Sequence, residues 1–335
     1  MTPAPYYTDD QVTLYHGRAL DITRELNAGA VDAIVTSPPY FGLRDYHAEG
    51  QYGLEDSPAE YVDNMRDLFA ELRRVLADDG TLWLNLGDSY SAAGGHTDPG
   101  ETSALQGRRV RLMQNVPSKS ADRPAKNLLG IPWRVAFALQ DSGWILRNAI
   151  IWHKPNAMPE SVTDRLSGRY ELVFLFSKSR RYWFDLDPIR IACSSLDPSD
   201  PSYRANGKSD RRRKDHTAPP GQTPQTNMVA TGTRHVAAAA AGRNPGDVWS
   251  IPTQPFPGSH FAVYPVELPQ RCILAGCKPG GTVLDPFSGS GTTGVAAQRT
   301  GRRYIGIDIN AEYLDLSLTH PKRLQGATLD FEAGA

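Results

Sequence analysis

The apolar and polar positions in the first part of the chain alternate in a way that predicts strands and helices in turn. The runs VTLYHG (12–17) and VDAIVT (31–36) are typical of buried strands, and DITREL (21–26) predicts a helical turn between them. Residues 58–76 predict an amphipathic helix that begins near Pro58 and ends at the ADDG segment. Its apolar residues recur at helical spacing: Tyr61, Met65, Leu68, Phe69, Leu72, Val75 and Leu76.

The rest of the chain continues this alternation. Further strands are predicted at 81–88 (TLWLNLGD), 144–154 (WILRNAIIWHK) and 170–179 (YELVFLFSKS), with helices near 132–142 and over 264–277. Residues 281–310 predict a strand, a glycine loop, a helix and a second strand. Strands that alternate with helices predict an α/β fold whose mostly parallel sheet is covered on both faces.

Two segments lose this periodicity. Residues 91–125 predict a long loop, and residues 193–247 are rich in Pro, Ser, Gly and Thr. Within 201–245, eight Lys or Arg stand against two Asp, and the basic run is Arg211, Arg212, Arg213 and Lys214. A solvated, disordered stretch and a basic region that holds DNA phosphates are both open interpretations. We therefore expect residues 193–247 to be a region inserted between two halves of the same domain, residues 1–192 and 248–335.

Composition narrows the class of protein only a little. The chain has 335 residues and a formal net charge of −1, so overall charge does not indicate a nucleic-acid partner. Its three cysteines lack CxxC spacing, which argues against a disulfide framework and against a zinc site, and fits a reducing cytoplasm. The lack of a zinc-site pattern means that we expect no metal. No signal peptide and no apolar run of membrane-spanning length is visible, so we expect no membrane partner.

The strand at 31–36 ends in an unusual tip, Ser37-Pro38-Pro39-Tyr40. An isolated tip of this kind is more often a turn. Two consecutive prolines also fix the backbone, so that the Ser37 hydroxyl and the Pro38 carbonyl are preorganised as hydrogen-bond acceptors for an exocyclic amine. Such acceptors return electron density to a nitrogen whose lone pair is delocalised into the ring, and Tyr40 can stack on that ring.

A second candidate site is the glycine loop at 285–294, DPFSGSGTTG. Gly289 and Gly291 follow a strand and precede a helix, and the next strand ends in Asp308, an acid that suits ribose hydroxyls. Gly289, Gly291 and Gly294 have the spacing of GxGxxG, which is a weak signal by itself, so a tight turn is also open. The carboxylate of Asp285 favours S-adenosylmethionine, which carries a positive sulfonium and no phosphate, over a nicotinamide dinucleotide with its pyrophosphate.

Together, TSPPY (36–40) and DPFSGSGTT (285–293) resemble the motifs of the amino-methyltransferases that act on DNA, in the order of their β class. Segments 80–90, 147–161 and 259–273 resemble further parts of that family. The resemblance implies a Rossmann-like, circularly permuted fold with a mostly parallel seven-stranded sheet, S-adenosylmethionine as cofactor, and a target base flipped out of double-stranded DNA. It implies catalytic roles for Ser37, Pro38, Pro39 and Tyr40, and cofactor contacts for Asp21, His260, Phe261, Asp285, Pro286, Phe287, Ser288, Gly289, Gly291, Thr292, Thr293 and Asp308.

Several of these assignments have a structural alternative of similar weight. The family's Gly-Asp pair is Gly17-Arg18 here, so Asp21 supplies the adenine contact or caps a helix. His260 and Phe261 line the cofactor or belong to a loop or the core. Lys154 is a candidate phosphate contact, and Asp88 lines the cleft or caps a turn.

A serine at position 37 resembles the branch that methylates N4 of cytosine, whereas an aspartate is typical of the N6-adenine branch; N6-adenine remains the alternative. Two rivals are a methyltransferase acting on protein glutamine or RNA, for which the glutamine enzymes show Asn before Pro-Pro-Tyr, and a DNA-binding module that has lost catalysis. Both motifs are intact here, which favours the enzyme. A cognate restriction endonuclease and a homodimer are open partners.

Overall fold

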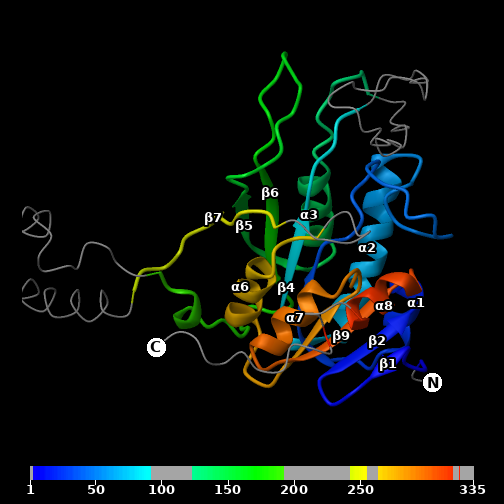
Figure 1. Ribbon diagram of the computed structural model, residues 1–335, viewed down its shortest axis with the longest axis vertical. Coiled ribbons are helices and arrows are strands. Elements are labelled where there is room, and N and C mark those ends of the chain that lie inside the picture. Colours follow the sequence, from blue (N-terminus) through cyan, green and yellow to red (C-terminus); the bar gives the residue numbers. More distant parts are fainter. Residues whose placement is uncertain (1–2, 92–122, 192–241, 255–262, 320–323, 325–335) are drawn as a thin grey trace, which may run out of the picture. The chain divides into compact units, whose positions relative to one another are not determined.

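The computed structural model describes residues 3–91, 123–191, 242–254, 263–319 and 324 (Figure 1). The chain divides into two units: residues 1–185 with 247–335, and residues 186–246. In the second unit a short 3-10 helix, Asp187–Ile189, and a bridge between Ile191 and Arg243 are described. The basic run at 211–214 lies outside the described residues, so the target-recognition role of the inserted region stays a prediction.

A single mixed sheet dominates the first unit. Among the described residues it has nine strands: β1 (Tyr7–Thr8), β2 (Val12–His16), β3 (Val31–Thr36), β4 (Leu76–Leu86), β5 (Ile145–His153), β6 (Tyr170–Ser177), β7 (Val248–Ser250), β8 (Thr282–Asp285) and β9 (Arg303–Asp308). Their order is β1-β2-β9-β8-β3-β4-β6-β5-β7. Strands β2, β9, β8, β3 and β4 run parallel, whereas β6 is antiparallel to both β4 and β5. Without the short edge strands β1 and β7, this is the expected seven-stranded α/β sheet.

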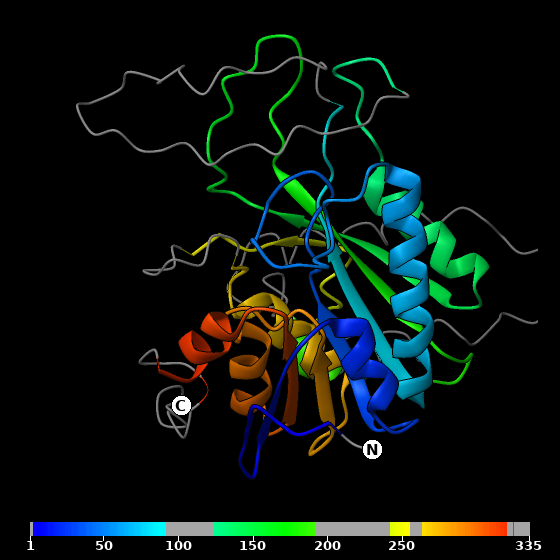
Figure 2. The same cartoon turned by 90° about the vertical axis from the view of Figure 1, so that its right-hand side faces the viewer.

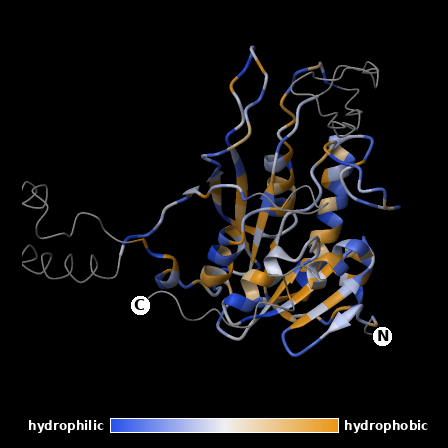
Figure 3. Cartoon of the chain, viewed as in Figure 1, coloured by the Kyte–Doolittle hydropathy of each residue, from blue (hydrophilic) through white to orange (hydrophobic). Residues whose placement is uncertain are grey.

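Helices cover both faces of this sheet. In Figure 2, α1 (Ala19–Glu25), α2 (Pro58–Val75) and α3 (Ile131–Asp141) lie on one side, and α6 (Glu267–Gly276), α7 (Thr292–Arg299) and α8 (Ala311–Thr319) lie on the other. The central strands are predominantly apolar (Figure 3), as burial on both faces requires. No helix in the described part of the chain is both long and apolar enough to cross a membrane.

Helix α2 illustrates how local sequence builds these layers. Ser57 caps its first turn by accepting a hydrogen bond from the Glu60 amide at 3.2 Å, and Pro58 occupies the first helical position, where its missing N–H costs nothing. The apolar face predicted from the sequence is the buried one: Tyr61, Met65, Leu68, Phe69, Leu72 and Val75 are all fully buried. The predicted helix is therefore confirmed.

Two predicted boundaries are wrong. Strand β4 begins at Leu76 rather than at residue 81, because Leu76 pairs with Val31 and the ADDG segment forms an irregularity before pairing resumes between Ala33 and Thr81. Helix α6 begins at Glu267 rather than at residue 264, since the hydroxyl of Tyr264 is drawn into the hydrogen-bond cluster around Asp285.

Candidate active site

Strand direction brings the candidate residues to one edge of the sheet. The parallel strands β3, β8 and β9 end at Thr36, Asp285 and Asp308, so their following loops meet there. Strand β6 runs the other way, and its first residues, Tyr170 and Glu171, therefore reach the same edge. Sequence reasoning that considers only carboxyl ends of strands misses Glu171.

The loop after β3 is held rigidly. The carbonyl of Pro39 accepts a hydrogen bond from the Tyr61 hydroxyl of α2 at 2.9 Å. The ring of Tyr40 packs against Gly87, where a Cβ would lie 2.5 Å from the ring. Only glycine is therefore accommodated at position 87 without moving Tyr40, and the Ser-Pro-Pro-Tyr tip keeps a fixed shape.

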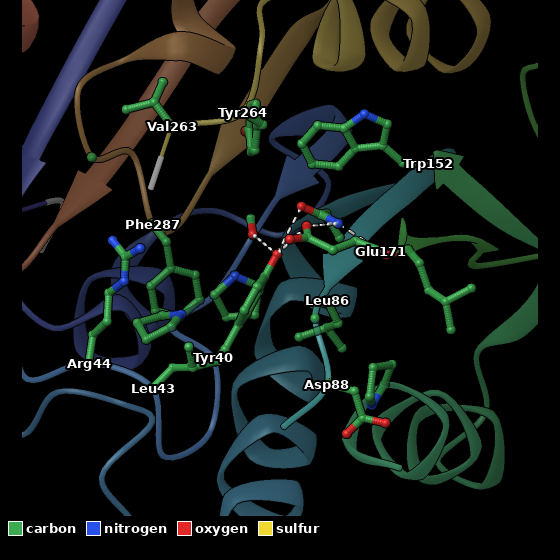
Figure 4. Close-up of a pocket in the computed structure, with 18 of the residues that line it drawn as sticks. Tyr40, Leu43, Arg44, Leu86, Asp88, Trp152, Glu171, Val263, Tyr264 and Phe287 are labelled. Carbon is green, nitrogen blue, oxygen red and sulfur yellow. Dashed lines mark hydrogen bonds between the residues drawn. The ribbon is translucent and has the colours of Figure 1, made fainter. Parts of the chain in front are cut away.

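The polar groups of this tip form a chain of hydrogen bonds that ends on a carboxylate (Figure 4). The Ser37 hydroxyl donates to Tyr40 Oη at 3.3 Å, and Tyr40 Oη lies 2.8 Å from Glu171 Oε2 and 3.1 Å from Asn85 Oδ1. Asn85 Nδ2 donates to the same Glu171 oxygen at 3.1 Å. Lys154 forms an ion pair with the other oxygen of Glu171. Burial raises the pKa of Tyr40 well above its usual value, so its phenol keeps its proton at neutral pH.

Asp285 joins the two motifs. Its carboxylate accepts hydrogen bonds from the Thr36 hydroxyl at 2.7 Å, the Thr293 hydroxyl at 2.6 Å and the Phe287 amide at 3.0 Å, and Tyr264 Oη lies 3.3 Å away. The side chain is almost completely buried, and this burial raises the pKa of its carboxyl. The buried Asp285 thus links the ends of two strands that are 249 positions apart in sequence. Its expected contact with the sulfonium stays a prediction.

The glycine loop is shaped by backbone contacts to Asp308. The Gly289 amide donates to Asp308 Oδ2 at 2.7 Å, and the Asn310 amide donates to Oδ1 at 2.8 Å. Gly291 begins helix α7 at a φ of 77°, and a Cβ there would lie 2.9 Å from the Cβ of Ser317. Burial raises the pKa of Asp308 to about 6 despite these two donors. Its ionisation is therefore sensitive to any further donor.

One cavity of about 1370 Å³ contains both motifs. This exceeds the roughly 300–1,000 Å³ that a single small ligand occupies, so a nucleoside cofactor and an extruded base fit together. The lining includes the whole Ser-Pro-Pro-Tyr tip, residues 285–290 and 292 of the glycine loop, and Asp308. Arg44 Nη1 and Ser290 Oγ, on residues that also line the cavity, are buried with no hydrogen-bond partner among the described residues. Unsatisfied buried donors of this kind are typical of a site that receives a polar ligand.

Most of the predicted loop residues line this cavity, and two that do not line it make contacts that shape the glycine loop. Ser37, Pro38, Pro39, Tyr40, Asp285, Pro286, Phe287, Ser288, Gly289, Thr292 and Asp308 are in the lining. Gly291 instead begins α7, and Thr293 is turned to Asp285. His260 and Phe261 lie outside the described residues. The cofactor and catalytic roles themselves stay predictions.

One predicted placement needs correction. Asp21 is absent from the cavity lining and does not cap α1, because β2 ends at His16 and the helix already begins at Ala19 with Arg18 as its N-cap residue. Asp21 instead lies in the first helical turn, 3.9 Å from Arg18. Lys154 does line the cavity, but it is mostly buried, pairs with Glu171 and lies 4.5 Å over the Trp152 ring; its expected contact with a DNA phosphate stays a prediction.

Asp88 combines the two roles that the sequence left open. Its carboxylate accepts from the amides of Gly130 at 3.1 Å and Ile131 at 3.0 Å, and so caps the N-terminus of α3. It also lines the cavity, as Figure 4 shows. Burial raises the pKa of its carboxyl.

Three residues of the site were not found from the sequence. Glu171 and Asn85 lie within strands, where a polar residue amid an apolar run was the only available signal. Tyr264, whose hydroxyl lies against Asp285 and Thr293, precedes a helix and carries no motif of its own. All three act through contacts between segments that only the fold brings together, which periodicity does not reveal.

Comparison with known proteins agrees with this geometry. A family model of N6 and N4 methyltransferases, described as DNA methylase, matches residues 31–319. The Type II methyltransferase M.Cfr9I of Citrobacter freundii is 41% identical over 94% of this chain and 88% of its own length. M.SmaI of Serratia marcescens is 42% identical over 90% of this chain and 87% of its own.

Solved structures show the same fold. The PvuII DNA methyltransferase (cytosine-N4-specific) aligns with a TM-score of 0.60 and 19% identity over 98% of this chain and 90% of its own. A DNA modification methylase of Thermus thermophilus, in complex with S-adenosyl-L-methionine, aligns with a TM-score of 0.54 and 20% identity over 96% of this chain and 97% of its own. With the two motifs in one cavity and a family match that spans most of its length, the chain belongs to the N6/N4 DNA methylase family.

Proposed function

We propose that this protein transfers a methyl group from S-adenosylmethionine to the exocyclic N4 amine of a cytosine flipped out of double-stranded DNA, at a specific site. The observation that carries the proposal is the single cavity that holds both the Ser37–Tyr40 tip and the glycine loop, with Asp285 bonded to residues of each. A neutral serine at position 37 is what favours cytosine over adenine. The PvuII enzyme, whose name gives cytosine N4 as its target, has the same fold.

The residues of the glycine loop suit the cofactor. Asp308 accepts hydrogen bonds from two backbone amides and can still accept hydrogen bonds from ribose hydroxyls. Burial raises its pKa, and hydrogen bonds from ribose hydroxyls would stabilise its ionised form. Arg44 and Ser290 would offer unsatisfied donors to polar groups of the cofactor. When bound, S-adenosylmethionine supplies an electrophilic methyl group on a sulfonium, which departs as a neutral thioether.

The tip of β3 acts on the target amine. The Ser37 hydroxyl gives its own proton to Tyr40, so the lone pairs of Ser37 Oγ are available to accept from an amine N–H, with the Pro38 carbonyl as the second acceptor. Both acceptors are fixed before the reaction by the two prolines and by the bond from Tyr61 to Pro39. Because the amine is activated in place, no strong base is required before attack.

Nucleoside analysis tests this assignment. DNA treated with the protein and S-adenosylmethionine is digested, and the modified nucleosides are separated by chromatography and identified by mass spectrometry. We expect N4-methylcytosine. N6-methyladenine would move the target to adenine within the same family, and the absence of any methylated nucleoside across varied DNA would overturn the proposed activity. A restriction partner and a homodimer stay predictions.

A further inference from the structure

We propose that Glu171 is the terminal acceptor of a hydrogen-bond relay that runs from the target amine through Ser37 and Tyr40. The relay is a positioning and proton-release device, and it rests on the proposed function. Its observed links are Ser37 Oγ to Tyr40 Oη at 3.3 Å and Tyr40 Oη to Glu171 Oε2 at 2.8 Å. Glu171 itself acts on the amine only through these two hydroxyls.

The direction of the relay follows from the chemistry of its members. Tyr40 has one hydroxyl proton and two acceptors nearby, Asn85 Oδ1 at 3.1 Å and Glu171 Oε2 at 2.8 Å. The charged and closer acceptor takes the proton, because hydrogen bonds to ionised groups are shorter and stronger. The oxygen of Tyr40 is then free to accept from Ser37, and the oxygen of Ser37 is free to accept from the amine.

The surroundings pair Glu171 on both of its oxygens and hold it in place. One oxygen is paired with Lys154, and the other accepts from Asn85 Nδ2 as well as from Tyr40. The glutamate side chain is only 17% exposed and that of Lys154 only 19%. A negative charge that is paired and shielded in this way strengthens each bond in the chain that points toward it.

The relay also provides a route for the proton that the product must lose. When the amine nitrogen forms its bond to the methyl carbon, the bond between that carbon and sulfur breaks and its electron pair stays on sulfur. The nitrogen then carries a positive charge and one hydrogen too many. That proton passes to Ser37 Oγ while the Ser37 proton passes to Tyr40 Oη and the Tyr40 proton to Glu171, which becomes neutral until solvent removes the proton. Through this relay the carboxylate of Glu171 takes the part that an aspartate at position 37 would otherwise have.

The test compares Glu171→Gln, Tyr40→Phe and the double variant under single-turnover conditions with saturating cofactor and DNA. The introduced glutamine keeps the size of glutamate and its capacity for hydrogen bonds but lacks its charge. We expect Glu171→Gln to slow methyl transfer roughly ten- to hundredfold, the factor carried by a hydrogen bond to a charged group. The double variant should be no slower than the slower single variant, because both interrupt one relay.

Two further readouts separate this role from a structural one. Cofactor affinity by calorimetry and base flipping by 2-aminopurine fluorescence should stay within about twofold of wild type in Glu171→Gln, a loss of only ~0.4 kcal/mol. The matched control is Glu71→Gln, since Glu71 also forms an ion pair, with Arg74, but is absent from the cavity lining; it should transfer methyl groups at the wild-type rate.

The relay is overturned if Glu171→Gln reacts at the wild-type rate, if the two single losses multiply in the double variant, or if Glu171→Gln fails to bind cofactor or to flip the base. In each of these cases, methylation of DNA by the wild-type protein would still support the proposed methyltransferase function. A wild-type protein that methylates no DNA would overturn both.

Discussion

We expect the buried carboxyl of Asp308 to make cofactor affinity depend on pH, over the range between its pKa in the free protein and its pKa in the complex. Its pKa of about 6 arises first from burial, is lowered by the amides of Asn310 and Gly289, and is raised again by Asp285. Ribose hydroxyls can donate only to an acceptor, so they favour the ionised form and bring its pKa in the complex toward the ordinary value near ~4. Cofactor binding therefore releases a proton between roughly pH 4 and pH 6, and affinity falls as the pH is lowered.

The size of this effect follows from the fraction of Asp308 that is ionised in the free protein. At pH 7 roughly nine-tenths is ionised and at pH 5 roughly one-tenth, so the dissociation constant for S-adenosylmethionine should rise about tenfold, which corresponds to ~1.4 kcal/mol. Isothermal titration calorimetry between pH 5 and pH 7 at constant ionic strength measures it directly. Asp308→Asn should bind more weakly at pH 7 and should show a nearly flat profile.

A matched control addresses the neighbouring histidine. His16 lies close enough to lower the pKa of Asp308, and its ring nitrogen lies 3.1 Å from the Ile309 carbonyl. His16→Asn should therefore retain most of the pH slope. If wild type and Asp308→Asn had the same slope, or if affinity rose on acidification, the ribose contact assigned to Asp308 would be refuted.

The remaining predictions concern the folding of the site. Ser57→Ala removes the cap of α2 and should lower the free energy of unfolding by about 1 kcal/mol in urea titrations; no change would show that the 3.2 Å bond to the Glu60 amide does not stabilise the helix. Thr36→Val keeps the shape of its side chain but leaves the Asp285 carboxylate with one donor fewer, and should cost roughly 1.5–3 kcal/mol by the same measurement. A stability equal to wild type would mean that Asp285 does not couple the two strand tips.

The sequence was sufficient for the features that depend on local pattern and strand direction. The apolar spacing of α2 predicted its buried face, and the strands predicted before the two loop motifs are parallel, which places both loops at one edge of the sheet. The early start of β4 depends on pairing between Leu76 and Val31, which no local pattern encodes. Glu171 reaches the site because β6 is antiparallel to its neighbours, a property of the assembled sheet.

The ion pair of Lys154 could not be predicted for a similar reason. A lysine after a strand near the site was a reasonable phosphate contact while its surroundings were unknown. The carboxylate that pairs with it belongs to the start of the next strand, 17 positions later, and is brought alongside only by the β5–β6 ladder. Conversely, Asp21 was placed near the cofactor by resemblance, and the direct passage from β2 into α1 leaves it outside the cavity.

In the proposed mechanism two motifs divide the chemistry within one cavity: the tip of β3 would activate the amine, and the glycine loop would hold the cofactor. Transfer of labelled methyl groups to DNA by Ser37→Ala, measured beside its affinity for S-adenosylmethionine, tests this division most directly. We expect a loss of about tenfold or more in transfer, with an affinity within about twofold of wild type. Wild-type transfer by Ser37→Ala, or a parallel loss of transfer and affinity, would contradict the division.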